Sequence, residues 1–168
     1  MSFRRPVMAT FGASGFLPLG FTFVLAIVML LPIGTGLANV TMPHLVMISV
    51  FYWMTHRPLL MPYGACAILG FFLDLWLAVP LGLNMLLLLL TRLFIINQLK
   101  YFRGRSRFVY MSVFSGMSLG LFLLAWLVMS VVKGQMLSVR PVLLQWLITA
   151  FAYAPVGLLL SRMRRLLM

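Results

Sequence analysis

Few residues in this chain of 168 can take part in acid–base, nucleophilic or metal chemistry. Asp74 is the only acidic residue, Cys66 is the only cysteine, and the two histidines, His44 and His56, are not adjacent. One carboxylate cannot form an acid and base pair, and these residues lack the spacing of zinc ligands. A single cysteine also excludes an intrachain disulfide. The sequence therefore predicts no enzymatic activity, no metal and no cofactor.

Asp74 lies within an apolar run, where an ionisable side chain is costly and marks a functional or structural site. Mostly small residues recur with it at helical steps of three and four, in the series Tyr63, Ala67, Gly70, Asp74 and Ala78. Such a face lets a neighbouring helix approach closely. We therefore expect Asp74 to face the interior of a helical bundle.

Arg92 is the only basic residue well inside the next apolar run. At 1.5 Å per residue, Asp74 and Arg92 lie about 10 and 17 Å from the turn between their runs, a difference that a long arginine side chain can largely bridge. Asn84, Thr91 and Gln98 recur at seven-residue steps beside Arg92. We favour a structural ion pair between Asp74 and Arg92 over a ligand site or a relay, because polar groups in membranes often join helices.

Three small residues, Ser112, Gly116 and Gly120, repeat at four-residue steps in a later run. This spacing is typical of close helix packing, either within the chain or against another protein. The sequence leaves both alternatives open.

Basic residues are densest between the apolar runs 81–99 and 108–132, at Lys100, Arg103, Arg105 and Arg107. This segment predicts attraction to anionic lipids, or docking of an acidic or filament-forming cytoplasmic partner.

Several aromatic residues and both histidines fall near the ends of apolar runs. Tyr52 and Trp53 fit an aromatic belt at a membrane interface, and His44 and His56 fit ordinary interfacial positions.

The elements that position these residues follow from composition, which is 64% hydrophobic and 8% charged, against about a quarter charged in ordinary globular domains. The apolar runs are continuous rather than alternating, so they predict transmembrane helices and not a barrel. We expect an all-α polytopic membrane protein forming a single transmembrane domain over 1–168, with a kink at Pro155. The six expected helices are about 16–33, 40–55, 59–79, 81–99, 108–132 and 141–160.

Basic residues also predict the orientation, because they concentrate on the cytoplasmic side of membrane proteins. With six spans, ten of the thirteen basic residues fall on the side that holds both termini, and only Lys133 and Arg140 fall on the other. We therefore expect both termini in the cytoplasm. The net charge of +12 is scattered between apolar runs in this way, which argues against nucleic-acid binding.

Two segments carry a resemblance to a known family. The first is PHLVMISVFYW (43–53), with a proline opening the second run and Tyr-Trp near its end; the second is GFFLDLWLAVPLGLN (70–84), with Gly-xxx-Asp and a Pro-Leu-Gly turn. Together they resemble the rod shape-determining membrane protein MreD family. The positions that match its motif are Pro43, Tyr52, Trp53, Gly70, Asp74, Pro80 and Gly82.

This resemblance implies a non-enzymatic scaffold in the bacterial inner membrane. It implies binding to a single-span MreC-like protein and, with MreB filaments, the RodA glycosyltransferase and its transpeptidase partner, guidance of lateral peptidoglycan synthesis by the cell-elongation complex.

MreD-like proteins are also similar, at the level of a six-helix fold, to the substrate-binding components of energy-coupling vitamin transporters. The alternative function is therefore binding of a small, vitamin-like molecule. Against it, the first run contains only Ala26 rather than an alanine-spaced packing motif.

Overall fold

The computed structural model describes residues 17–30, 42–102 and 106–166 of the chain. In these ranges it contains six α-helices and no strand, as the continuous apolar runs predict. The helices are α1 (Leu17–Leu30), α2 (Leu45–His56), α3 (Tyr63–Trp76), α4 (Leu83–Phe102), α5 (Arg107–Lys133) and α6 (Arg140–Leu166), and a short 3-10 helix, η3 (Pro58–Leu60), lies between α2 and α3.

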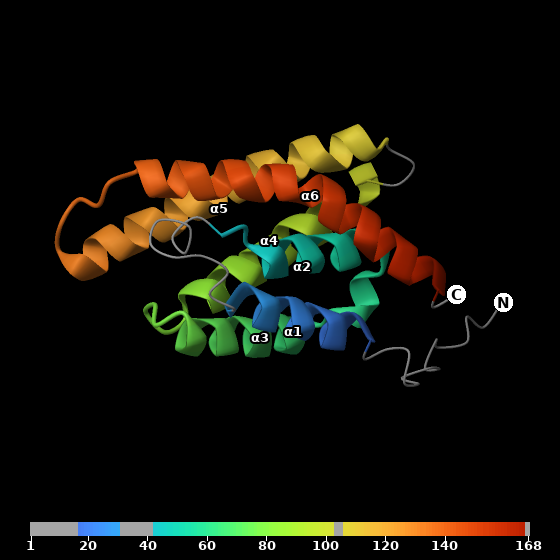
Figure 1. Cartoon of the computed structure of the whole chain (residues 1–168), viewed down its shortest axis with the longest axis horizontal. Coiled ribbons are helices and arrows are strands. Elements are labelled where there is room, and N and C mark those ends of the chain that lie inside the picture. Colours follow the sequence, from blue (N-terminus) through green and yellow to red (C-terminus); the bar gives the residue numbers. More distant parts are fainter. Residues whose placement is uncertain (1–16, 31–41, 103–105, 167–168) are drawn as a thin grey trace, which may run out of the picture.

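Successive helices run in opposite directions, and they lie in three layers (Figure 1). The middle layer contains α2 and α4, with α1 and α3 on one side and α5 and α6 on the other. Helix α2 contacts α1, α4 and α6. Because the helices alternate in direction, the C-terminal ends of α2, α4 and α6 and the N-terminal ends of α3 and α5 lie at the same end of the bundle.

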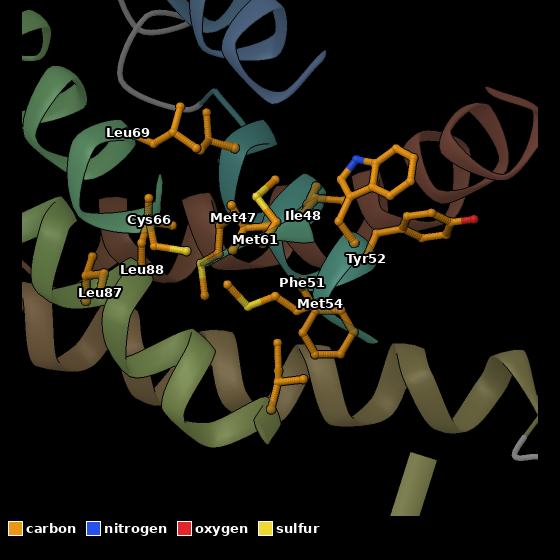
Figure 2. Close-up of a cluster of buried hydrophobic side chains, with 14 of the residues drawn as sticks. Met47, Ile48, Phe51, Tyr52, Met54, Met61, Cys66, Leu69, Leu87 and Leu88 are labelled. Atoms are coloured by element: carbon orange, nitrogen blue, oxygen red, sulfur yellow. The ribbon is translucent and has the colours of Figure 1, made fainter. Parts of the chain in front are cut away.

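The shortest α-helix, α2, forms the centre of the hydrophobic core. Every residue from 46 to 54 in α2 is buried, as expected for a helix that is apolar all round. The Phe51 ring lies 5.1 Å from that of Phe114 in α5 and 5.8 Å from that of Tyr153 in α6. Figure 2 shows the side chains of Met47 and Met54 in the same cluster. The central helix therefore joins the outer layers through flexible and aromatic side chains.

Helix α3 (Tyr63–Trp76) is shorter than the expected 59–79, because two prolines interrupt the helix at its start. Pro58 begins η3, and Pro62 has an extended backbone immediately before α3. A proline disfavours helical geometry in the residue that precedes it, so Met61 separates η3 from α3. At the other end Ala78 has a φ of 49°, a left-handed conformation that cannot continue a helix.

Helices α5 and α6 are the longest, and α6 extends beyond the expected 141–160. Both are long and apolar enough to cross a membrane, whereas α1 to α4 contain shorter apolar helices. Helix α6 continues through Pro155, and Figure 1 shows its axis changing direction near the middle. A proline inside a helix removes one backbone hydrogen bond, which accounts for this bend.

Candidate functional site

Asp74 lies at the end of α3 and caps the start of α4. Its side chain is 1% exposed, and its carboxylate oxygens accept hydrogen bonds from the backbone N–H groups of Gly82 at 2.8 Å, Asn84 at 2.7 Å and Met85 at 3.4 Å. The first N–H groups of a helix have no intrahelical acceptor, and the N-terminus carries partial positive charge. The carboxylate satisfies both requirements, so the only acid of the chain holds α3 and α4 together.

The small-residue face predicted around Asp74 is only partly correct. Gly70 and Asp74 are buried and Ala67 is half-buried, whereas Tyr63 is exposed and Ala78 lies beyond the end of α3. The predicted face therefore extends over the middle of α3 but not over its two ends.

Gly70 is the point of closest approach between α3 and α4. A Cβ atom there would lie 2.6 Å from the backbone nitrogen of Met85, and still closer to the Cα of Met85. Gly82 has a φ of 95°, which a glycine adopts without strain. The carbonyl of Pro80 accepts a hydrogen bond from Leu83 at 3.1 Å. These three positions of the motif therefore build the tight connection that Asp74 closes.

His44 joins this connection to two further helices. It precedes α2, where its Nδ1 accepts a hydrogen bond from the Met47 backbone, and its Nε2 lies 3.2 Å from the side-chain oxygen of Asn84. An acceptor role at Nδ1 places the ring proton on Nε2, which then donates to Asn84. The backbone N–H of His44 donates to the Thr149 hydroxyl in α6 at 3.1 Å. His44 thus lies at a helix end, as predicted, but it is 4% exposed and buried between helices.

Sequence reasoning missed two sets of buried hydrogen bonds made by hydroxyl groups. Thr149 donates to the carbonyl of Gln145 while it accepts from His44. Ser49 of α2 lies 2.8 Å from Thr22 of α1, whose hydroxyl also bonds the Pro18 carbonyl. Isolated hydroxyl residues within apolar runs were the available signal, because a buried hydroxyl requires a partner.

The expected ion pair between Asp74 and Arg92 is not formed among the described residues. The guanidinium of Arg92 instead donates to the Pro58 carbonyl at 3.3 Å and lies 4.3 Å from the centre of the Tyr63 ring. The physical reason is that Asp74 is already bound at the first turn of α4, and Arg92 lies about 12 Å further along that helix than Asn84.

Tyr52 and Trp53 do not form an exposed interfacial belt, contrary to expectation. They are 4% and 3% exposed, and their rings contact each other edge to face. Tyr52 also stacks on His56, which stacks on Tyr110 of α5. Figure 2 shows the Tyr52 hydroxyl at the edge of the hydrophobic cluster, pointing away from it. These two residues therefore pack inside the chain at the end of α2.

The small residues of α5 face outward. Ser112, Gly116 and Gly120 are exposed, and a Cβ atom on either glycine would meet nothing within 4 Å among the described residues. This face therefore does not pack closely against another helix of the described chain, which was one of the two alternatives.

Basic residues from two helices lie near Tyr52 at one end of the bundle. Arg107 at the start of α5 and Arg164 and Arg165 near the end of α6 are all near enough to interact electrostatically with Tyr52 of α2. The side chain of Lys100, and residues Arg103 and Arg105, lie outside what the structure describes. Of the predicted basic surface, the structure therefore describes only Arg107, which lies with two arginines of α6 near Tyr52.

The remaining motif position, Pro43, precedes His44, and its carbonyl accepts a hydrogen bond from the Leu45 backbone N–H at 2.9 Å.

Within the described ranges, no group of three or more histidine, cysteine or acidic residues is arranged to hold a metal ion.

Comparison with known proteins gives one finding. The family model described as rod shape-determining protein MreD matches residues 11–163. No curated protein and no solved structure matches the chain.

Proposed function

This chain belongs to the rod shape-determining protein MreD family, and on that premise we propose that it acts as a non-enzymatic scaffold of the cell-elongation complex. The scaffold binds a single-span MreC-like protein and, directly or through it, MreB filaments, the RodA glycosyltransferase and its transpeptidase partner. In this way it guides peptidoglycan synthesis along the cell wall. Membership of the family carries the role in rod shape, and the partners are the proposed part.

The observation that carries the proposal is the contrast between one hydrogen-bonded polar network inside the bundle and an open apolar surface on α5. Asp74, His44 and Asn84 are buried and hydrogen-bonded to one another's helices, so they are committed to structure. In contrast, no described residue lies against the outer face of α5 at Gly116 and Gly120. This arrangement favours binding of helices over turnover of substrates.

We assign the outer face of α5 as the docking site for the partner helix. The face begins with Ser112, Gly116 and Gly120 and continues at helical spacing through Leu123 and Leu127, all of which are exposed. Small residues allow two helix backbones to come close, and the leucines then supply packing area. A single-span helix matches this long and narrow surface.

The proposed location is the bacterial inner membrane, crossed six times with both termini in the cytoplasm. The ends of α2 and α6 and the start of α5 place Arg57, Arg164 and Arg107 at one end of the bundle, while Lys133 and Arg140 lie at the other. This segregation supports the orientation. Although α2 has only 12 residues, protein rather than lipid surrounds it, so it does not need the full hydrocarbon thickness.

Co-purification tests the proposal. The full chain is expressed with a tagged MreC-like single-span protein, extracted in mild detergent, and the complex is quantified by mass spectrometry. We expect Gly116→Leu to reduce recovery of the partner by at least about tenfold, because lost close packing costs more than 1.4 kcal/mol.

Gly157→Leu in α6 is the matched control, because a Cβ atom there also meets nothing within 4 Å in the described structure. It should leave recovery unchanged. Equal recovery with wild type and Gly116→Leu would refute the assigned face. A purified chain that binds a vitamin-like molecule tightly and recovers no protein partner would refute the scaffold role.

A further inference from the structure

Arg92 is a buried cation without a counter-charge among the described residues. It is 9% exposed, and its Nε–H is buried without an acceptor among the described residues. Its two partners are the neutral Pro58 carbonyl and the Tyr63 ring, and the Cys66 thiol lies near enough to interact with its charge. Arginine keeps its charge in proteins, and a buried charge is costly unless a counter-charge pairs with it.

No side chain of this protein can supply that counter-charge. Asp74 is the only acidic residue in the whole sequence, and three backbone N–H groups of the α3–α4 connection already bind its carboxylate. No anion among the described residues is therefore left to neutralise Arg92, and another molecule can supply one.

The position of Arg92 along the bundle indicates headgroup depth. Its guanidinium is level with the α2–α3 connection and with the first residue of α3. Backbone that is not in a helix stays at or outside the hydrocarbon boundary unless protein covers it. The sequence of α4 also becomes polar at Asn97, which is exposed, about 8 Å beyond Arg92. An arginine at this depth can reach the phosphate level of a leaflet.

Exposed apolar side chains are sequence neighbours of Arg92 and of Pro58, whose carbonyl accepts its hydrogen bond. Leu59, next to Pro58, is 84% exposed, Leu93, next to Arg92, is 48% exposed, and Tyr63 is 47% exposed. Acyl chains can cover exposed leucines, whereas a partner carboxylate would leave them uncovered. The density of arginines at this end of the bundle also attracts anionic lipids.

We propose that Arg92, with the Tyr63 ring beside it, binds the phosphate of an anionic phospholipid, whose acyl chains lie along Leu59 and Leu93. The lipid phosphate accepts hydrogen bonds from the guanidinium and supplies the charge that the chain lacks. The site concerns a lipid and is separate from the docking face proposed on α5.

Native mass spectrometry of the full chain tests the site. Protein purified in mild detergent is titrated with phosphatidylglycerol and, separately, with phosphatidylcholine of the same acyl chains. We expect wild type to retain phosphatidylglycerol preferentially. Arg92→Gln should weaken this retention by about tenfold or more, since it removes the charge-assisted hydrogen bonds. Arg57→Gln removes an exposed arginine from the same connection and should leave the retention close to wild type.

A conservative variant keeps the test informative if Arg92→Gln does not fold. Arg92→Lys preserves the charge but loses the planar fork, and its retention should lie between those of wild type and Arg92→Gln. Phosphatidylglycerol should also raise the thermal unfolding midpoint of wild type more than that of Arg92→Lys.

Three results would overturn the proposal. The first is equal retention by wild type and every folded Arg92 variant. The second is an Arg92-dependent rise in the unfolding midpoint with inorganic phosphate alone, which would indicate a site for the free anion. The third is loss of a co-purified acidic protein from the Arg92 variants with lipid retention unchanged, which would assign the counter-charge to a protein.

Discussion

The α3–α4 and α5–α6 hairpins solve the same problem of joining two antiparallel helices, but they do so differently. In α3–α4 the helices are pressed together at Gly70, and the Asp74 carboxylate binds the backbone of the second helix. In α5–α6 the turn is closed by Gly134, with a φ of 64°, and by the Trp126 indole, which donates to the Leu137 carbonyl at 3.0 Å. Few residues of α5 and α6 are fully buried in the described structure.

This difference separates residues that maintain the fold from residues available to partners. The motif positions Gly70, Asp74 and Gly82 are used within the chain. The small residues of α5, by contrast, leave space that nothing in the described chain fills. Similar residue types therefore have opposite consequences in the two hairpins, and mutation of each can test this distinction.

The largest effect is expected from Gly70→Ala. The added Cβ atom would overlap the backbone of Met85, so α4 must move, and overpacking of this kind costs up to about 3 kcal/mol. The thermal unfolding midpoint in detergent, followed by tryptophan fluorescence, should fall clearly. An unchanged midpoint would mean that the close contact of the two helices is not required.

Replacement of Asp74 should have the next largest effect. Asp74→Ala leaves the first turn of α4 without its acceptor and should cost about 2 kcal/mol, whereas Asp74→Asn keeps one acceptor oxygen and should cost about 1 kcal/mol. The same unfolding measurement ranks the two variants. If Asp74→Ala were as stable as wild type, the capping role would be wrong; if partner recovery fell with no loss of stability, Asp74 would belong to the docking site.

Gly116→Ala should have the smallest effect, and its sign should be opposite to that of Gly70→Ala. Alanine is favoured over glycine in a helix by about 0.5–1 kcal/mol, and the methyl group meets open space. The unfolding midpoint of the isolated chain should therefore rise slightly. A fall in the midpoint would show that this face is packed within the chain.

Local patterns predicted the helical class and the burial of Asp74 correctly. Helix starts and proline bends depend on short-range geometry. The start of α5 was therefore predicted within one residue, and a bend in α6 was predicted from its internal proline. The sequence patterns did not predict the partners of Asp74 and His44. Their partners lie in other elements, and several arrangements of the same helices would satisfy the same periodicity.

By itself, the sequence determined that this is an all-helical membrane protein of the rod shape-determining family with one acidic residue, because composition and motif spacing are properties of the chain alone. Only the tertiary structure decided that α2 lies at the centre, that Asp74 binds a helix N-terminus, and that Arg92 has no counter-charge within the described ranges. Each of these depends on which surfaces meet. A carboxylate bonds to the nearest donors that packing presents, and here packing presents backbone N–H groups of the α3–α4 connection before it presents an arginine.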